Sequence, residues 1–305
     1  MNQSWLDRKN PLPSFYDISI ASLLMANILL IANLNCDRIL QLDKPLQTGG
    51  RFHYQDGGQR LGGGGANTGL GLVWAHHRVA LVSQVGRDKI GDWLLAEAST
   101  QGIDCHLIQR HDEASNEMLL VMTPDGERTI IRPQRPIFEL PAPPVWSQWD
   151  AVYFNSSAEG VVSWAKTALN HSLVFAQLAK DDRLRPCHIL IASKTDMAER
   201  SDLTPWKYGL SIAGDSLKYF IVTDGGDGAI LYSGNDSTHV AAMTSNVVDT
   251  TGAGDAYASG LIHGMTTGLT IIDAMKEGAQ WAAFAVATQS SIPGETLKAY
   301  LELNA

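Results

Sequence analysis

The sequence predicts an α/β protein with a mostly parallel central sheet and a small additional β-sheet. Short apolar segments alternate with helical segments along most of the 305 residues, which is the pattern of parallel strands joined by crossover helices. One hairpin signal interrupts this alternation. Hydrophobic residues make up 45% of the chain, and a chain near this length buries roughly three quarters of its unfolded surface. We therefore expect one large core.

The first α/β units are expected in the N-terminal third of the chain. The run 27–34, NILLIANL, is apolar enough for a strand that is buried on both faces. The glycine-rich stretch 61–67 leads into a helix, and a strand at 79–85 leads into a second helix at 88–101. Each strand is thus followed by a helix, as parallel pairing requires.

A hairpin is expected after these units. The turn signal Pro124-Asp125-Gly126 separates apolar strands at 118–122 and 128–131. Because a hairpin does not fit inside a parallel sheet, we assign it to a small extra sheet. The stretch 38–60 is expected to supply further strands of that sheet.

The second half of the chain resumes the alternation. The expected strands are 151–154, 173–176, 189–192 and 219–223, with an antiparallel return strand at 229–232 and helices at 157–170, 256–267 and 271–287. No convincing linker separates the two halves. We therefore expect one domain over 27–305, with a β appendage from about 38–60 and 106–135, and an N-terminal extension at 1–26.

Charge and cysteine content narrow the class of protein. The formal net charge of −9 argues against sequence-independent binding to nucleic acid. The three cysteines are far apart and form no CxxC, so a disulfide framework or a zinc ribbon is not expected. The apolar segment 18–34 is short for a membrane span of about 20 residues and is interrupted by two asparagines. We expect a cytoplasmic protein without a membrane anchor.

Residues 247–255, VVDTTGAGD, carry the strongest chemical signal. An extended segment enters a glycine turn, and a helix-like sequence follows. Gly252 and Gly254 leave room for a ligand to approach the backbone. The first N–H groups of the helix, from Ala253 to Asp255, would stabilise an anion such as a phosphoryl group. Asp255 would then take a proton from an attacking hydroxyl. The plainer alternative is that Asp255 caps the helix and the glycines only form a turn.

The segment DTTGAGD at 249–255 resembles the DTxGAGD signature of the ribokinase/PfkB family of carbohydrate kinases. The glycine-rich loop near Gly62 resembles that family's first signature, and the order and spacing of both agree across most of the chain. The resemblance implies a ribokinase-like three-layer αβα sandwich with a mostly parallel sheet and a small β-sheet lid. It also implies transfer of a phosphoryl group from ATP to an alcohol.

Signatures of other enzyme classes do not occur in the sequence. There is no GxxxxGK[ST] P-loop, no GxGxxG fingerprint, no GxSxG elbow and no HExxH. A P-loop enzyme and a Rossmann oxidoreductase are therefore disfavoured. The nine histidines show no metal-ligand spacing, and the adjacent pair His76–His77 is expected in a solvated turn.

The sugar is expected to bind after the first strand. Asn35 and Asp37 follow that strand, and ligands of open α/β sheets bind beyond the carboxyl ends of strands. A carboxylate accepts from two neighbouring hydroxyls, although Asp37 could instead be a turn residue. The resemblance favours a sugar contact, because the family's substrate aspartate lies in such an NxD. It also places Gly63, Gly64 and Asn67 in the family's GGxxxN loop.

Two substrate positions depart from the family pattern. Many ribokinase-like members carry a lysine where this chain has Gly64, which argues against ribose in particular. Asn155 stands where some relatives place a glutamate near the sugar, although it could simply cap the helix that follows.

The loop after the strand 219–223 is expected to bind the nucleotide. Its sequence TDGGDG resembles the family's TxGxxG loop, with Thr223, Gly225 and Gly228 at the motif positions. An ordinary hairpin turn is the alternative. Gln280 falls near a polar residue that borders the nucleotide in relatives. The resemblance thus implies ATP as the phosphoryl donor.

The resemblance also implies Mg²⁺. Relatives carry NxxE after the strand that corresponds to 189–192, and Ser193 and Asp196 take those two places here. The aspartate is shorter than a glutamate, so its reach toward magnesium is reduced. A frame shifted by three would use Asp196 and Glu199 instead, inside the expected helix, and we prefer the first frame.

A monovalent cation such as K⁺ is left open by the sequence. Asp249 and Thr251 could supply two oxygens to it. The turn at 287–293 is shorter than the glycine-containing turn that helps to enclose the cation in relatives. The shorter turn argues against potassium activation.

The sequence as a whole predicts an ATP-dependent kinase that phosphorylates a primary hydroxyl of a monosaccharide, with Asp255 as the base. A nucleoside kinase of the same fold is an alternative. A non-catalytic sugar-binding sensor is another, motivated by Ser193 and Asp196. We expect a small sugar and ATP as partners, no nucleic acid or membrane, and a homodimer paired through the lid.

Overall fold

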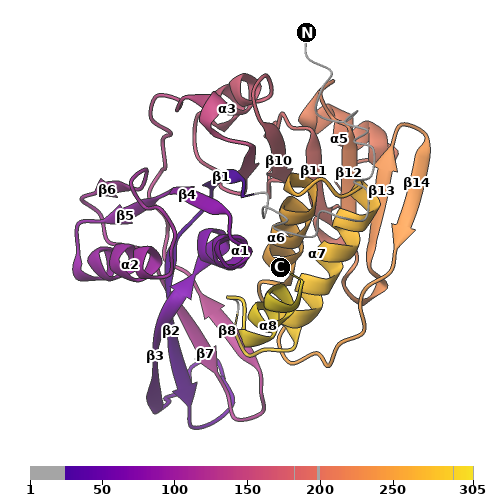
Figure 1. Ribbon diagram of the computed structural model, residues 1–305. Helices are drawn as coiled ribbons and strands as arrows, with labels where there is room; N and C mark the ends of the chain where they lie inside the picture. The colour runs from indigo at the N-terminus through magenta and orange to yellow at the C-terminus, as the bar shows by residue number, and fades with distance from the viewer. Residues whose placement is uncertain (1–24, 182, 198–199, 291, 305) are drawn as a thin grey trace.

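The computed structural model describes residues 25–304 except 182, 198, 199 and 291 (Figure 1). Residues 1–24 of the expected N-terminal extension lie outside the described residues. The strands are β1 Asn27–Ile31, β2 Asn35–Leu42, β3 Tyr54–Gly62, β4 Arg78–Val82, β5 Gln84–Gly86, β6 Gln109–His111, β7 Glu117–Met122, β8 Arg128–Ile131, β9 Ala151–Phe154, β10 Leu173–Gln177, β11 Ile189–Ser193, β12 Tyr219–Thr223, β13 Ala229–Ser233 and β14 Asp236–Val240. The α-helices are α1 Gly63–Trp74, α2 Lys89–Thr100, α3 Val161–Ala168, α4 Lys194–Met197, α5 Pro205–Ala213, α6 Ala253–Thr266, α7 Ile271–Val286 and α8 Glu295–Leu303.

The central sheet has eight strands in the order β14-β13-β12-β11-β10-β9-β1-β4 (Figure 1). The six strands β1, β4 and β9 to β12 pair in parallel. The strands β13 and β14 extend the sheet antiparallel at one edge. The predicted parallel sheet is confirmed, and so is the return strand at 229–232, which lies within β13.

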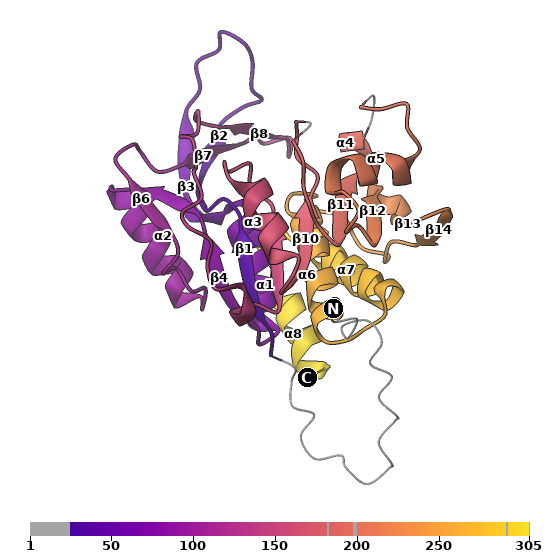
Figure 2. The ribbon, with the colours of Figure 1, turned by 90° about the horizontal axis from the view of Figure 1, so that it is seen from above.

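Alternate residues of β1 enter two different hydrophobic cores. Ile28 and Leu30 pack with residues of α1, α6 and α7, whereas Leu29 and Ile31 pack with residues of α3 and α5. All four are fully buried, because the period of two in a strand places neighbours on opposite faces. The sheet therefore lies between two helical layers (Figure 1, Figure 2), which is the predicted three-layer sandwich.

A second, four-stranded sheet in the order β3-β2-β7-β8 stands apart from the main sheet (Figure 2). We call this sheet the lid. Its β7 and β8 are the predicted hairpin, and β2 and β3 cover the two ends of the predicted stretch 38–60. The strand β2 begins shortly after β1 ends, and β3 runs directly into α1. The lid is thus joined to the body at the carboxyl end of β1.

The register of the lid strands assigns three charged residues to one face. Asp37 pairs with Arg60 of β3 and with Met118 of β7, and Met122 of β7 pairs with Arg128 of β8. Directly paired residues share a face, and every second residue returns to it. The side chains of Asp37, Arg60 and Arg128 therefore lie on the same face, which we call the inner face of the lid.

Two expected elements have different bounds in the structure. The strand expected at 79–85 is divided, because β4 ends at Val82 and β5 leaves the main sheet to pair with β6. At the break, the hydroxyl of Ser83 accepts the N–H of Leu34 at 3.1 Å. The helix expected from 157 begins at Val161, because Gly160 has a φ of +89°. The elements α5, β14 and α8 were not predicted.

The expectation of a solvated turn at His76–His77 is wrong for His77. Its side chain is buried, with 5% exposure. Its Nδ1 accepts the N–H of Ala26 at 3.2 Å, so Nε2 carries the proton and donates to Nδ1 of His263 at 2.9 Å. The histidine joins the end of α1 to α6 and to the start of β1.

The described residues contain neither a helix that could span a membrane nor a disulfide bond. Among the helices of the described residues, none has the length and apolar character needed to cross a membrane. Cys36, Cys105 and Cys187 are unpaired thiols, as expected. Burial, with the nearby charges of Glu117 and Asp37, raises the pKa of Cys36 to about 12, so this thiol is not an activated nucleophile.

Candidate active site

The expected anion-binding turn lies at the N-terminus of α6. Gly252 immediately precedes the helix and has a φ of +78°, a conformation that favours glycine. The N–H of Ala253 donates to the carbonyl oxygen of Thr250 at 3.3 Å. The next two N–H groups, of Gly254 and Asp255, have no acceptor one turn earlier in the helix. Gly254 is exposed, so an anion can approach these groups.

Asp255 is held by two asparagine side chains from distant parts of the chain. Nδ2 of Asn67, on α1, donates to Oδ2 at 2.9 Å. Nδ2 of Asn155, which follows β9, donates to Oδ1 at 3.0 Å. Burial raises the pKa of Asp255, and the two amide hydrogen bonds oppose that shift. The carboxylate is therefore more basic than an exposed aspartate and has a fixed orientation.

Three glycines bring the backbone against the polar side chains. A Cβ on Gly62 would lie 2.3 Å from Oδ1 of Asp37, and one on Gly63 would lie 2.9 Å from Nδ2 of Asn35. A Cβ on Gly64 would lie 2.4 Å from Nδ2 of Asn155. The contact between Asn155 and Asp255 therefore depends on the absence of a side chain at position 64.

Two amide oxygens of this cluster are unsatisfied. Oδ1 of Asn35 and Oδ1 of Asn67 are buried and accept no hydrogen bond from the described residues. Asp37 is buried beside them, with 7% exposure. Because a buried acceptor without a donor costs free energy, a ligand that carries hydroxyl groups would stabilise this arrangement.

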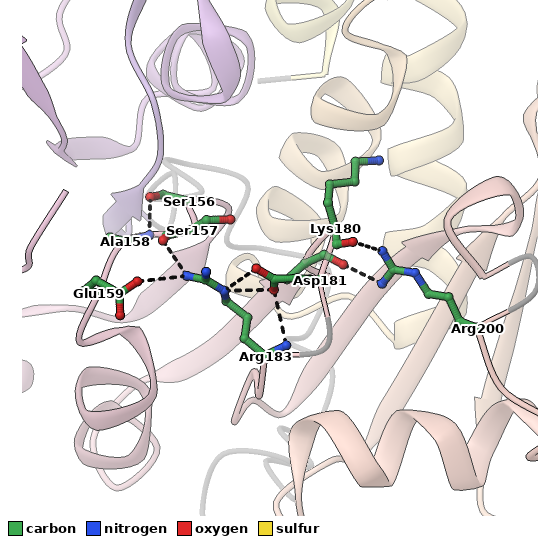
Figure 3. A network of polar contacts seen from close by, with 9 residues as sticks. Ser156, Ser157, Ala158, Glu159, Lys180, Asp181, Arg183 and Arg200 are labelled. Carbon is green, nitrogen blue, oxygen red and sulfur yellow. Dashed lines mark hydrogen bonds and ion pairs between the residues drawn. The ribbon is translucent and has the colours of Figure 1, made fainter. Parts of the chain in front are cut away.

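A polar network fixes the loop that follows Asn155 (Figure 3). Arg183 donates to the carbonyl oxygen of Ser157 at 2.6 Å and to both carboxylate oxygens of Asp181 at 2.9 Å. It also lies 3.7 Å from Glu159. The network joins the loop after β9 to the loop after β10, and so restrains the backbone next to Asn155.

The expected nucleotide loop is the connection between β12 and β13. The hydroxyl of Thr223 donates to the carbonyl oxygen of Ala192 at 3.2 Å. Gly225 and Gly228 have φ values of +52° and +91°, and a Cβ on Gly228 would lie 2.2 Å from the carbonyl oxygen of Val240. The hairpin backbone itself therefore accounts for both glycines, and their role in nucleotide binding stays a prediction.

Lys194 contacts this loop directly, whereas Gln280 lies on a helix that packs against the strand β14. Lys194, at the start of α4, forms an ion pair with Asp224 at 2.5 Å, which ties the loop to the end of β11. Gln280 is half-buried on α7, a helix that packs against β14. No hydrogen bond joins Gln280 to the loop among the described residues, so its role also stays a prediction.

The residues expected near magnesium lie at the junction of β11 and α4, with Ser193 as the last residue of the strand. The N–H of Asp196 donates to Oγ of Ser193 at 3.0 Å. Asp196 lies inside the short helix α4. Its carboxylate, 15% exposed, pairs with Lys180, which is 80% exposed.

Asp249 is engaged on both of its carboxylate oxygens. Oδ1 accepts the N–H of Thr251 at 2.8 Å, and Oδ2 lies 2.5 Å from Nη1 of Arg128 on the lid. Burial alone would raise the pKa of Asp249, but the N–H of Thr251 and the guanidinium of Arg128 together lower it. Asp249 is thus an ionised carboxylate that joins the body to the lid.

The comparisons with known proteins identify the family. The model of the pfkB family carbohydrate kinases matches residues 25–156 and 182–297. The chain belongs to this family. As a pfkB-family protein it is similar to the ribokinase of Staphylococcus aureus (strain COL), with 23% identity over 305 aligned positions that cover 87% of this chain and 96% of that one. The expected class of enzyme, a carbohydrate kinase, is confirmed.

Solved structures of pfkB-like kinases confirm the fold. Ribokinase from Thermotoga maritima superposes with a TM-score of 0.75 at 18% identity, covering 92% of this chain and 100% of that one. A nucleoside kinase from Methanocaldococcus jannaschii gives a TM-score of 0.72 at 19% identity, covering 92% and 99%. At this level of identity the likeness shows the ribokinase-like fold.

In this pfkB-family kinase, the predicted sugar-side residues and Asp255 gather in one place. The residues brought together are Asn35, Asp37, Gly63, Gly64, Asn67, Asn155 and Asp255. Arg60 and Arg128 were not predicted as site residues. Arg128 is 121 positions from its partner Asp249, and the only signal in the sequence was its place in a strand expected for the lid.

Proposed function

We propose that this pfkB-family protein is an ATP-dependent sugar kinase that transfers the γ-phosphoryl group of ATP to a primary hydroxyl of a monosaccharide. The observation that carries the proposal is the position of Asp255. Its carboxylate lies at the N-terminus of α6, between the amides of Asn67 and Asn155. A proton acceptor, an anion-binding helix end and a set of hydroxyl-binding groups thus lie within one cluster.

Asp255 acts as the general base. A sugar hydroxyl that reaches the carboxylate gives its proton to it as the phosphoryl group is transferred. A general base works best when its pKa approaches the operating pH, and burial raises the pKa of Asp255 in that direction. The amides of Asn67 and Asn155 hold the carboxylate in one orientation, so no reorientation is needed during the reaction.

The start of α6 stabilises the negative charge of the phosphoryl group. The N–H groups of Gly254 and Asp255 are fixed donors, and the positive end of the helix dipole adds to their effect. Gly252 allows the chain to turn into the helix at this point. These backbone groups are in place before the substrate binds.

The nucleotide is proposed to lie along the other end of the same sheet edge. Thr223, Gly225 and Gly228 would border it after β12, with Gln280 of α7 on the far side. Asp196 is the carboxylate proposed for magnesium, because Mg²⁺ is usually held by one or two carboxylates together with substrate phosphates; the lysine that pairs with it, Lys180, is 80% exposed and would turn away into solvent. Asp196 would hold the ion through water, and the ion would supply positive charge to the phosphates.

The proposed acceptor is a neutral polyol. Asn35, Asp37 and Asn67 offer acceptors for several hydroxyl groups. A nucleoside is the second candidate, because the fold is shared with the nucleoside kinase described above and Gly64 leaves the lysine position of many ribose-binding relatives without a side chain. A non-catalytic sensor is disfavoured by the complete set of contacts around Asp255.

The experiment is a coupled assay of ADP release over panels of sugars and nucleosides. We expect turnover with one or a few monosaccharides that carry a free primary hydroxyl, and none with the Asp255→Asn variant. Turnover confined to nucleosides would replace the sugar by the second candidate. Sugar binding by calorimetry without any turnover would instead support a sensor. The unpaired thiols agree with a proposed cytoplasmic location.

A further inference from the structure

Arg128 of the lid forms an ion pair with Asp249, the carboxylate that was expected to bind a monovalent cation. Its Nη1 lies 2.5 Å from Oδ2 of Asp249, and the two side chains are 20% and 15% exposed. The other oxygen, Oδ1, accepts the N–H of Thr251 at 2.8 Å. Both carboxylate oxygens are therefore bound to N–H groups, one of which carries a full positive charge.

The carbonyl oxygens nearby are also engaged by donors. Nη1 of Arg60, the second arginine of the inner lid face, donates to the carbonyl oxygen of Gln289 at 2.9 Å. The hydroxyl of Thr288 lies 2.9 Å from the carbonyl oxygen of Ala285 and 3.1 Å from that of Ser290. These residues belong to the end of α7 and to the short turn at 287–293. The turn is thus held by side-chain donors, one of them a guanidinium of the lid.

Such surroundings do not fit a monovalent cation. K⁺ needs several oxygen lone pairs directed at one point, whereas Oδ2 of Asp249 and the carbonyl oxygen of Gln289 face arginine N–H groups, and Oδ1 of Asp249 accepts the N–H of Thr251. The buried hydroxyl of Thr251 has no hydrogen-bond partner among the described residues, but a single free oxygen does not form a cation site. Burial, and to a smaller extent the nearby charge of Arg128, lower the pKa of Arg60, whereas the charges of Asp37 and Asp249 oppose that shift. The two guanidinium groups are thus close enough to repel each other. A further cation between them would be repelled by both guanidinium groups.

We propose that Arg128 supplies the fixed positive charge beside the anion-binding turn, in the place that the family resemblance gives to a monovalent cation. Asp249 lies three positions before Gly252 in the sequence, so the Arg128–Asp249 pair sits next to the turn that leads into α6. Arg128 acts through Asp249 and is therefore a positioning residue. The kinase then does not need K⁺, because a residue of the lid supplies the positive charge beside the turn. This inference rests on the proposed role of the α6 N-terminus.

The test compares KCl with choline chloride at equal ionic strength, in the full-length protein. Thermal unfolding and turnover on the best acceptor from the panel are measured for wild type, Arg128→Met and Arg128→Lys. Wild type and Arg128→Lys should show no potassium-specific change in Tm or kcat. Arg128→Met should lose roughly ten- to a hundredfold in kcat in choline chloride, and KCl should restore part of the loss and raise its Tm.

Arg132→Met is the matched control, because it removes the same charge from an exposed position directly after the lid strand β8. It should behave as wild type in both salts. Potassium-specific stabilisation or activation of the wild type would overturn the proposal, and so would a folded Arg128→Met variant that ignores KCl. If Arg128→Met does not fold, the wild type and Arg128→Lys still show whether the protein responds to K⁺, and a response of either would overturn the proposal. A protein without turnover on any acceptor would contradict the proposed function, whereas the Tm measurements would still test the cation.

Discussion

At the residue scale, Asp255 carries the largest expected effect. Asp255→Asn keeps the size of the side chain but removes the proton acceptor, so kcat should fall by about 10²–10⁴-fold. Sugar affinity measured by calorimetry should change little, because one of the two asparagines still donates to the amide oxygen and the other can turn its own amide oxygen toward the new NH2 group. Asp215→Asn, at an exposed position, is the control. A variant that keeps more than half of the wild-type kcat would show that another group is the base.

Asp37 is expected to act on binding instead of turnover. Hydrogen bonds to a charged acceptor contribute about 1.5–3 kcal/mol each, and Asp37→Ala removes an acceptor for two hydroxyls. The KM for sugar should therefore rise by about tenfold or more, with little change in the KM for ATP. Steady-state kinetics with each substrate varied in turn measures both values. An unchanged KM for sugar would favour the alternative, a purely structural role for Asp37.

Gly64 tests the contact between Asn155 and the base. The Cβ of Gly64→Ala would lie 2.4 Å from Nδ2 of Asn155, so it should displace the amide and leave Asp255 with one donor. We expect a lower kcat with a folded protein. In an Asn155→Ala background the same substitution should cost little more, because the two changes act on one contact. Equal losses in both backgrounds would mean that Gly64 acts elsewhere.

At the element scale, the sequence predicts well those elements that have a clear hydrophobic pattern and turn residues at their ends. The run NILLI of β1 is buried on both faces, and its apolar residues enter two cores. The hairpin of β7 and β8 was set by its turn residues. By contrast, β5 leaves the main sheet because of its pairing with β6. That partner is distant in sequence, so local patterning could not indicate the break.

The buried side chain of His77 makes the stability of the folded protein depend on pH. Burial, and to a smaller extent the charges of His263 and His76, lower the pKa of His77 from 6.5 to about 4. The unfolded chain binds a proton near pH 6.5, and the folded protein binds it only near pH 4. The stability that His77 contributes is therefore complete above pH 6.5 and is lost as the pH falls toward 4.

His77→Gln should weaken this dependence. In the wild type, His77 should lower the free energy of unfolding by about 2 kcal/mol between pH 8 and pH 5, as measured by urea denaturation. The glutamine variant should be less stable at pH 8 and should lose less on acidification, although His188, whose pKa burial also lowers to about 4, keeps part of the effect. The exposed His171→Gln is the control. The same pH dependence in wild type and His77→Gln would contradict this account.

At the scale of the whole molecule, the sequence predicts only in part which residues come together in the candidate site. Asn35, Asp37 and Asp255 follow from motifs at the ends of elements, and the carboxyl edge of a sheet brings such ends together. The direct contact of Asn155 with Asp255 joins residues 100 positions apart. The Arg128–Asp249 pair depends on how the lid sits over the body. Both depend on tertiary packing, which one sequence does not reveal.

The outer face of the lid is suited to contact with a second copy of the chain. Leu119 pairs with Ile131, and Leu40 pairs with Val121, so these four apolar side chains share the face opposite to Arg128. Val121 is already buried within the subunit, but Ile131 is 49% exposed. The strand β3, at the lid edge, is exposed over most of its length. An unpaired edge and an apolar face both favour association.

We therefore expect a homodimer that pairs through the lids at micromolar concentration. Sedimentation should give a species of twice 33.0 kDa. Ile131→Glu places a charge on the outer lid face and should shift the protein to the monomer, whereas Ile137→Glu, at an exposed position outside the lid strands, should leave the dimer intact. Because a small sheet is marginally stable by itself, the monomeric variant should also be cut faster by protease near β7 and β8. A wild-type monomer whose lid hairpin is cleaved even with sugar bound would defeat both the pairing and the closure of the lid over the substrate.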